Sequence, residues 1–168
     1  GGIDREGFEE MAVRLVDKYF HYPNYYKIDG CPVFMIYDIK NLVSGLGGIE
    51  KTKEALDWFR ERTKQAGFPD LHFQITIWGE KSLNLSGFDS NMSGTTKDMV
   101  SLLGADSVTH YQFVHFAGVD RDYVEILEDV KKEWDRIDAE YTVPYFPHIS
   151  CGWDNNPRFK KFRKTIVK

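Results

Sequence analysis

The sequence predicts an α/β fold of the (β/α)8 TIM-barrel type, with only part of the barrel present. Short apolar runs of strand length alternate along the chain with amphipathic segments of helical period, which is the order of a parallel α/β sheet. The chain has 168 residues, whereas a complete eight-stranded barrel usually needs roughly 250. About four βα units can be counted. We therefore expect either part of a barrel or a small open α/β sheet, forming a single domain over residues 1–168.

The helices are predicted from apolar residues at three- and four-residue steps. In the first helix Phe8, Met11 and Leu15 follow this spacing, and Asp4 stands where an N-cap is expected. Gly67 stands where a left-handed residue commonly ends a helix. The expected helices cover residues 4–19, 48–66, 95–103 and 122–137, and the last of these is expected to bury Val124, Leu127, Val130 and Trp134.

The strands are predicted from short runs of apolar and β-branched residues. Residues 33–37 are continuously apolar, which suits a strand buried on both faces, and Asp29-Gly30 before them indicates a tight turn. No Gly-rich phosphate-binding turn follows any expected strand, which disfavours a Rossmann, P-loop or flavodoxin-like nucleotide site. The expected strands cover residues 31–37, 71–77, 107–113 and 143–149.

Composition and charge exclude several function classes. The net charge of −4 and the isoelectric point near 5.7 do not fit a nucleic-acid-binding protein. The basic run at residues 158–164 is short, and we interpret it as a solvated helix face. No apolar run is long enough to cross a bilayer. The chain begins with Gly1-Gly2 and no methionine, from which we expect an internal fragment.

Cysteine and histidine usage gives no sign of a metal site or another cofactor. Cys31 and Cys151 lie far apart and show neither a disulfide nor a zinc spacing. Two unpaired thiols are typical of a reducing compartment, which favours the cytoplasm. The five histidines show no HExxH or similar spacing. We therefore expect a protein without metal or organic cofactor.

Polar and aromatic residues stand at the end of every expected strand. In α/β barrels, functional residues gather where strands end and the following loops begin. Aromatic faces stack on the apolar faces of sugar rings, and carboxylates, amides and guanidinium groups bind the hydroxyls. The pattern therefore favours a glycan site. The expected substrate-binding residues are Tyr37, Asp38, Trp78, Glu80, Tyr111, His148, Trp153, Asp154 and Arg158.

Each of these residues also has a structural explanation, which the sequence leaves open. Asp38 is able to cap the following turn, and Glu80 to be a solvated loop carboxylate. His148 fits a buried histidine with its hydrogen bonds satisfied, and the tryptophans fit lid or core positions. An ion pair between Asp154 and Arg158 would lock their loop without any ligand.

Three segments resemble the WbsX-type proteins. Residues 26–37, Y-K-I-D-G-C-P-V-F-M-I-Y, resemble that family's segment Y-x-K-(V/I)-x-G-K-P-V-(F/L)-x-I-Y. Residues 152–158, G-W-D-N-N-P-R, look like its segment G-W-D-N-T-P-R, and Gly87-Phe88-Asp89 looks like the G-F-D element between them. The departures are Cys31 in place of lysine and Asn156 in place of threonine. The three occur in the family's order and together cover most of the chain.

The resemblance implies a (β/α)8 barrel related to the glycoside hydrolase family 99 endo-α-mannosidases. It also implies a role in bacterial polysaccharide biosynthesis, such as that of lipopolysaccharide, or in polysaccharide breakdown. Glycoside hydrolysis normally needs two carboxyl groups roughly 5–10 Å apart. In family 99 these lie in a segment of the kind N-E-W-x-E-G, which does not occur here; W-A-N-E-N-W is also absent.

Two functions therefore stay open. In the first, this chain supplies substrate-binding residues to a barrel that cleaves or transfers glycosidic bonds, with the catalytic carboxylate pair outside the chain. In the second, the chain is a non-catalytic glycan-binding module or scaffold. In either case, half a barrel leaves strand edges unpaired, from which we expect self-association.

Overall fold

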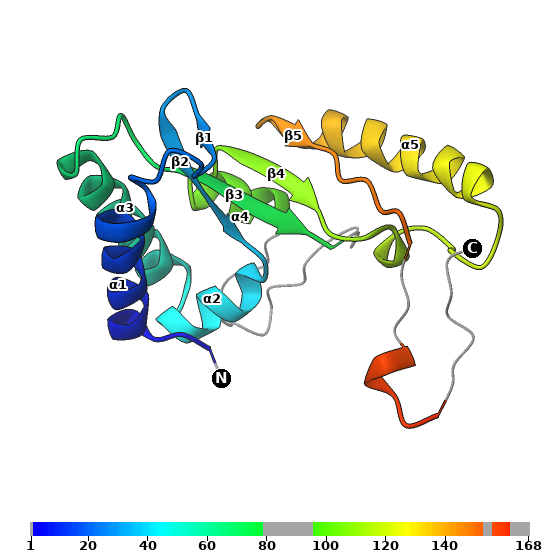
Figure 1. Cartoon of the computed structure of the whole chain (residues 1–168), viewed down its shortest axis with the longest axis horizontal. Coiled ribbons are helices and arrows are strands. Elements are labelled where there is room, and N and C mark those ends of the chain that lie inside the picture. Colours follow the sequence, from blue (N-terminus) through cyan, green and yellow to red (C-terminus); the bar gives the residue numbers. More distant parts are fainter. Residues whose placement is uncertain (1, 79–95, 153–155, 162–168) are drawn as a thin grey trace.

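The computed structural model shows a curled, five-stranded sheet alternating with helices, and it describes residues 2–78, 96–152 and 156–161 (Figure 1). The strand order is β1-β2-β3-β4-β5. Neighbouring strands from β2 to β5 are parallel, and β1 pairs antiparallel with β2. This arrangement confirms an α/β fold consistent with a partial TIM barrel. The strands are β1 (Lys27–Ile28), β2 (Cys31–Ile36), β3 (His72–Ile77), β4 (Ser107–His110) and β5 (Tyr145–Phe146).

All four expected helices are present. The first comprises α1 and a π-helical extension, and Asp4 caps it by accepting a hydrogen bond from the Gly7 N–H at 2.9 Å. Helix α2 was not expected, because it is short and begins directly after a strand. The helices are α1 (Arg5–Arg14), η1 (Leu15–Tyr19), α2 (Ile39–Leu46), α3 (Ile49–Gln65), α4 (Thr96–Leu102) and α5 (Tyr123–Glu140), with 3₁₀ turns η2 (Phe113–His115) and η3 (Asn156–Arg158).

A tight turn joins β1 to β2, as the Asp-Gly pair predicted. Asp29 and Gly30 have φ angles of 50° and 80°. Positive values at both central residues are typical of the type I′ turn, whose twist matches that of a two-stranded hairpin. The turn places Lys27 beside Pro32 and leaves the later part of β2 beyond the reach of β1.

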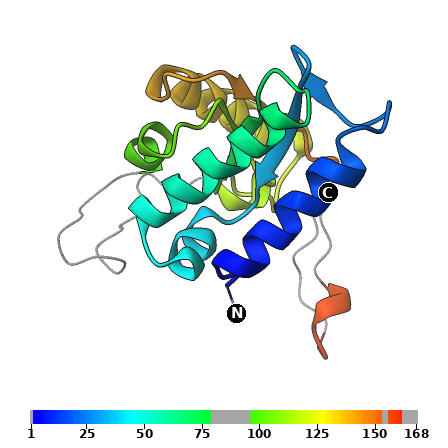
Figure 2. The ribbon, with the colours of Figure 1, turned by 90° about the vertical axis from the view of Figure 1, so that its left-hand side faces the viewer.

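Helices α1 and α3 lie side by side against one face of the sheet (Figures 1 and 2). Their contact is built on phenylalanine rings. The Phe59 ring of α3 lies 5.9 Å from the Phe8 ring of α1 and 5.2 Å from the Phe34 ring of β2. Phe8 and Phe59 are fully buried. Because large aromatic side chains bury the most apolar area, this cluster fixes the helices on the sheet.

Helix α5 packs partly on a second, smaller cluster. Phe113, Ile126 and Val130 form its buried centre, with Trp134 packed against them. Ile137, near the end of α5, belongs to the main core. The start of the helix extends past the sheet (Figure 1).

Three expectations about burial and strand length were wrong. Strand β2 is not buried on both faces, because Met35 is 52% exposed and Tyr37, directly after the strand, is 46% exposed. Val124 is 66% exposed because it lies in the first turn of α5, beyond the sheet. The last two strands are shorter than expected. The chain turns into η2 after β4, and Pro147 after β5 has no N–H for a strand ladder.

Candidate functional site

Aromatic residues follow three neighbouring strands at one end of the sheet. Because β2, β3 and β4 are parallel, their carboxyl ends meet at the same edge, and Tyr37, Trp78 and Tyr111 come directly after them. The ring centroids of Tyr37 and Trp78 lie 4.6 Å apart, those of Tyr37 and Tyr111 4.9 Å, and those of Trp78 and Tyr111 4.8 Å. The structure therefore brings three of the expected site residues into one cluster.

The cluster is tied to the backbone of the strand ends. The Trp78 indole Nε1–H donates to the Tyr37 carbonyl at 2.9 Å. The Tyr111 N–H donates to the Ile77 carbonyl at 3.2 Å, which continues the β3–β4 pairing by one residue. These bonds hold the cluster against the strand ends. The rings themselves are not fully covered: Trp78 and Tyr111 are partly buried, and Tyr37 is 46% exposed.

His115 joins this cluster and was not among the expected binding residues. Its ring centroid lies 4.9 Å from that of Trp78 and 5.2 Å from that of Tyr111. The 3₁₀ turn η2 carries it back over the end of β4. Partial burial lowers the pKa of His115 below its ordinary value, so the ring favours its neutral form. Its position four residues after Tyr111 was the available sequence signal. We call Tyr37, Trp78, Tyr111 and His115 the aromatic cluster.

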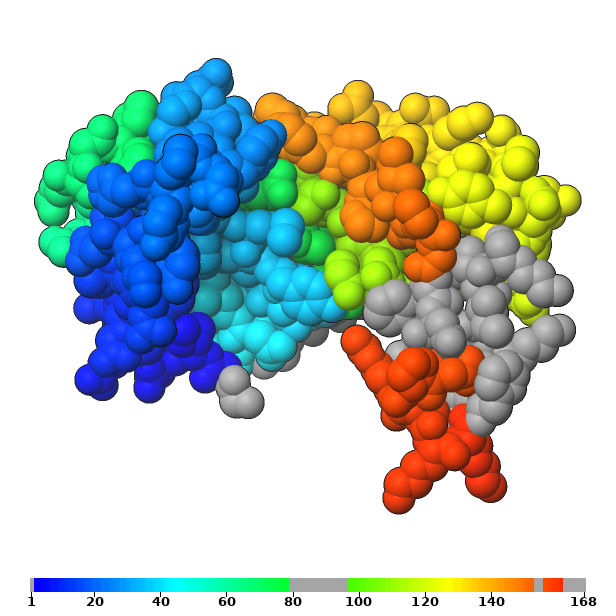
Figure 3. Space-filling view, in the orientation of Figure 1, coloured from blue at the N-terminus to red at the C-terminus, as the bar shows by residue number. Residues whose placement is uncertain are grey.

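The Tyr37 hydroxyl lies among polar and charged neighbours. Partial burial and a side-chain hydrogen bond with Tyr111 raise the pKa of Tyr37 to about 12, and Arg158 and Asp38 also act on it electrostatically. Tyr37 therefore keeps its proton at neutral pH and acts as a hydrogen-bonding hydroxyl. Arg158 comes from the segment that projects below the sheet in Figure 3, coloured red.

Asp38 caps helix α2. Its Oδ1 accepts from the Asn41 N–H at 3.0 Å, and its Oδ2 accepts from the Asn41 side-chain amide at 2.6 Å. These contacts match the capping role that the sequence allowed, and they keep the carboxylate beside the aromatic cluster. They also engage both carboxylate oxygens.

His148 does not join the cluster. The His148 ring is partly buried and lies 6.4 Å from that of Phe113, in the smaller core under α5. Glu80, Trp153 and Asp154 lie outside the described residues.

A buried polar group lies on the helix side of the same sheet end. The His110 imidazole Nδ1 is 2.5 Å from the Tyr145 hydroxyl, and its ring stacks on Phe116 at 4.5 Å. Its Nε2 lies 3.9 Å from Glu133, which is paired with Arg136 at 2.7 Å. Burial lowers the pKa of His110 to about 4, although the charge of Glu133 acts in the opposite direction.

The described residues contain neither a candidate metal-binding group nor a helix that could span a membrane. They contain no group of three or more histidine, cysteine, aspartate or glutamate side chains placed to hold a metal ion. In the same part of the chain no helix has the length and hydropathy to span a bilayer.

Comparison with known proteins places the chain in a family. The model of the family described as "Glycosyltransferase WbsX" matches residues 4–168, which is most of the chain. This chain belongs to the WbsX glycosyltransferase family. Membership gives it a carbohydrate-active role and implies a glycan substrate. No curated protein and no solved structure matches this chain.

Proposed function

We propose that this WbsX chain forms the sugar-binding part of a barrel that cleaves or transfers glycosidic bonds. The observation that carries the proposal is the aromatic cluster at the carboxyl ends of β2, β3 and β4. Parallel barrels place their active sites at this end. Half-exposed rings beside polar groups match what a pyranose requires, because its C–H faces stack and its hydroxyls form hydrogen bonds.

Individual roles follow from the contacts. Trp78 is the stacking platform, since it contacts Tyr37, Tyr111 and His115 and is held through its indole N–H. The Tyr37 hydroxyl stays protonated and serves as a hydrogen-bonding group for a sugar hydroxyl. Arg158 adds a positive charge that acts on Tyr37, and Asp38, which accepts from the Asn41 amide, adds a carboxylate.

The catalytic carboxylate pair is proposed to lie outside residues 1–168. The oxygens of Asp38 are occupied by the cap of α2, which suits orientation rather than proton transfer. A pair of carboxyl groups is what hydrolysis with retention or inversion normally uses. Neither of the two glutamate-containing family segments, N-E-W-x-E-G and W-A-N-E-N-W, occurs in this sequence.

Replacing Trp78 by alanine tests the binding proposal. We expect binding of a mannose-containing oligosaccharide to weaken about tenfold or more, because a stacking face is lost; tenfold corresponds to about 1.4 kcal/mol. Calorimetric titration of the 168-residue chain measures this. Trp78→Phe, which keeps a ring, should recover part of the affinity. Trp58→Ala, on α3 beneath Arg5, is the matched control and should bind as the native chain does.

A second function, a glycan-binding module without catalysis, is favoured by the missing carboxylate pair. Incubation of the chain with mannose oligosaccharides, followed by product analysis, tests the premise that the two functions share, namely that residues 1–168 hold no complete carboxylate pair. Turnover by residues 1–168 alone would contradict the placement of the pair elsewhere. Unchanged oligosaccharide affinity in Trp78→Ala would contradict both functions, since both depend on the aromatic cluster.

A further inference from the structure

His115 is the member of the aromatic cluster to which the proposed function gives no role. It lies on η2 and is exposed to solvent, as Tyr37 is, whereas Trp78 and Tyr111 are partly buried. The His115 ring meets the Trp78 ring at an interplanar angle of 70° and the Tyr111 ring at 34°. A sugar that covers the Trp78 ring therefore has the exposed His115 ring as a direct neighbour.

Hydrogen bonding distinguishes His115 from the histidines that are engaged within the sheet. His72 Nε2 lies 2.7 Å from the Ser107 hydroxyl, and His110 Nδ1 lies 2.5 Å from the Tyr145 hydroxyl. Within the described part of the chain, neither ring nitrogen of His115 has a hydrogen-bond partner. A neutral imidazole carries one N–H donor and one bare nitrogen that accepts. His115 therefore offers both a donor and an acceptor to a ligand hydroxyl.

His115 is also the one histidine of the cluster, and imidazole is the side chain whose ordinary pKa, about 6.5, lies between pH 5 and pH 8. The Tyr37 hydroxyl has a pKa of about 12 and keeps its proton in this range. Burial lowers the pKa of His115, and no charge of the described residues is among the causes. The charged or titratable groups described around the cluster are Tyr37 and Asp38 after β2, Tyr111 after β4, Arg158 of η3, and His148 beside Phe113.

We propose that His115 is a specificity-determining residue of the sugar site, where its neutral imidazole hydrogen-bonds a hydroxyl of an uncharged sugar. This role rests on the proposed function, because it requires a sugar bound at the aromatic cluster. An imidazolium has no acceptor, and a ligand that covers it also removes its water. A sugar with a carboxylate would instead favour the imidazolium, and burial has already displaced His115 from that state.

Binding of an uncharged sugar should be coupled to the loss of a proton from His115. The sugar covers the ring and occupies its acceptor, so the pKa of His115 should be lower in the complex than in the free chain. Affinity is therefore highest above the pKa of the free chain and falls as pH drops through it. We expect the Kd to rise about two- to fivefold from pH 7.5 to pH 5.5, because this window includes the ordinary histidine value of about 6.5.

Calorimetric titration of the 168-residue chain with the mannose-containing oligosaccharide, at pH 7.5 and pH 5.5, tests the proposal. His115→Gln keeps a donor and an acceptor that do not titrate, so its affinity should stay within about threefold of the native value at pH 7.5 and not change with pH. His115→Phe keeps only a ring and should bind about five- to tenfold more weakly at pH 7.5. His21→Gln, at an exposed histidine beside Phe68, is the matched control and should keep the native affinity and pH dependence.

The protonation of His115 itself provides a second measurement. In an NMR titration of the imidazole C–H resonances, saturating oligosaccharide should lower the pKa of His115 by about half a pH unit or more. An affinity that rises as pH falls overturns the proposal in favour of an acidic sugar paired with the imidazolium. A Kd of the native chain that does not change with pH overturns it too, as does a native pH dependence retained in His115→Phe.

The Trp78→Ala variant separates failure of this role from failure of the proposed function. Weakened binding in Trp78→Ala together with any of the overturning results removes the role of His115 and leaves the sugar site at the aromatic cluster. Native affinity in Trp78→Ala removes the sugar site itself, and the role of His115 falls with it.

Discussion

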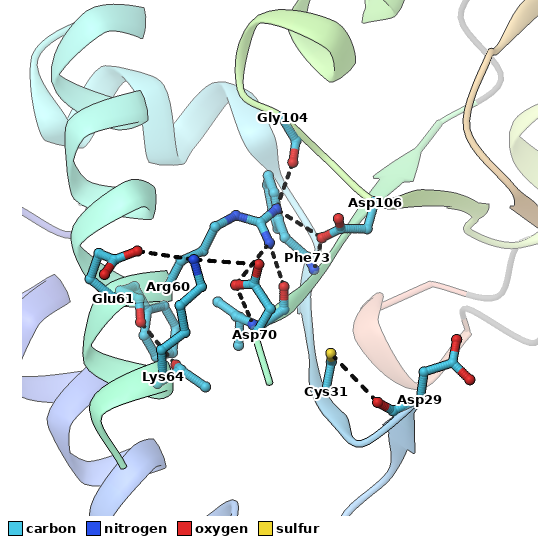
Figure 4. A network of polar contacts seen from close by, with 12 residues as sticks. Asp29, Cys31, Arg60, Glu61, Lys64, Asp70, Phe73, Gly104 and Asp106 are labelled. Atoms are coloured by element: carbon cyan, nitrogen blue, oxygen red, sulfur yellow. Dashed lines mark hydrogen bonds and ion pairs between the residues drawn. The ribbon is translucent and has the colours of Figure 1, made fainter. Parts of the chain in front are cut away.

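The two ends of the parallel sheet are built from different interactions. At the amino ends of β3 and β4, Arg60 donates to the carbonyls of Leu71 and Gly104 and to the Asp106 carboxylate (Figure 4). The same Asp106 oxygen accepts from the Phe73 N–H at 2.7 Å. At the carboxyl ends the rings of the aromatic cluster pack edge-to-face or tilted, form few hydrogen bonds and remain partly exposed.

This contrast suggests different roles for the two ends, stability at the amino ends of the strands and binding at their carboxyl ends. Arg60 satisfies carbonyls that would otherwise lie at strand and helix ends without partners, and only 15% of its side chain is exposed. Its three described hydrogen bonds all go to groups of the protein itself. The aromatic cluster has the opposite property, since ring faces and the hydroxyl of Tyr37 meet solvent. In α/β barrels, the amino-end face generally serves stability and the carboxyl-end face serves function.

The largest expected effect comes from Arg60→Met. We expect the free energy of unfolding to fall by about 1.5–3 kcal/mol, because charged hydrogen bonds to two carbonyls and Asp106 are lost. Urea unfolding measures this. Arg62→Met, on the same helix, is the control. Its exposed pair with Asp17 at 3.8 Å should contribute at most about 1 kcal/mol. Equal losses in both variants would erase the contrast between the two ends, as would weakened oligosaccharide affinity in folded Arg60→Met.

The second prediction concerns His110, which is buried near the carboxyl end of β4 and therefore should resist protonation. Its folded pKa of about 4 lies below the value of about 6.5 in an unfolded chain. The unfolded state therefore binds the extra proton between these values, and stability falls as pH drops from about 6.5 toward 4. The expected loss is about 2 kcal/mol by pH 5. His110→Asn should lack this part of the pH dependence, and His21→Asn, at an exposed ring, should retain it. Parallel urea series at pH 7 and pH 5 decide between these outcomes.

Much of the fold could be predicted from the sequence because local pattern determines it. Apolar spacing and caps such as Asp4 predict helices, and the Asp29-Gly30 pair predicts the hairpin. The ends of the strands were harder to predict. In β5, for example, only Tyr145 and Phe146 pair with β4, although the apolar run is longer. Burial of β2 was mispredicted, because an apolar run does not reveal whether strands exist to cover both of its faces.

The sequence predicted only those residues of the candidate site that directly follow a strand. Tyr37, Trp78 and Tyr111 meet because parallel strands end together, which the sequence implied. His115 was missed as a binding residue, since its placement depends on a 3₁₀ turn that folds it back. The Arg60 network was also not predicted. Its partners are distant in sequence, and no spacing rule connects a helix arginine to a loop carbonyl such as that of Gly104.

The smallest expected effect, and the sharpest test of the open end, comes from Tyr37→Phe. The ring and its contacts with Trp78 and Tyr111 stay, so stability should change by less than about 0.5 kcal/mol. The hydroxyl is lost, and oligosaccharide affinity should fall about three- to tenfold, as expected for one hydrogen bond. Tyr26→Phe is the matched control, because Tyr26 is 64% exposed on the β1 side of the chain. A stability loss in Tyr37→Phe without an affinity loss would mean that the hydroxyl bond to Tyr111 is structural, and the carboxyl end would then resemble the Arg60 end.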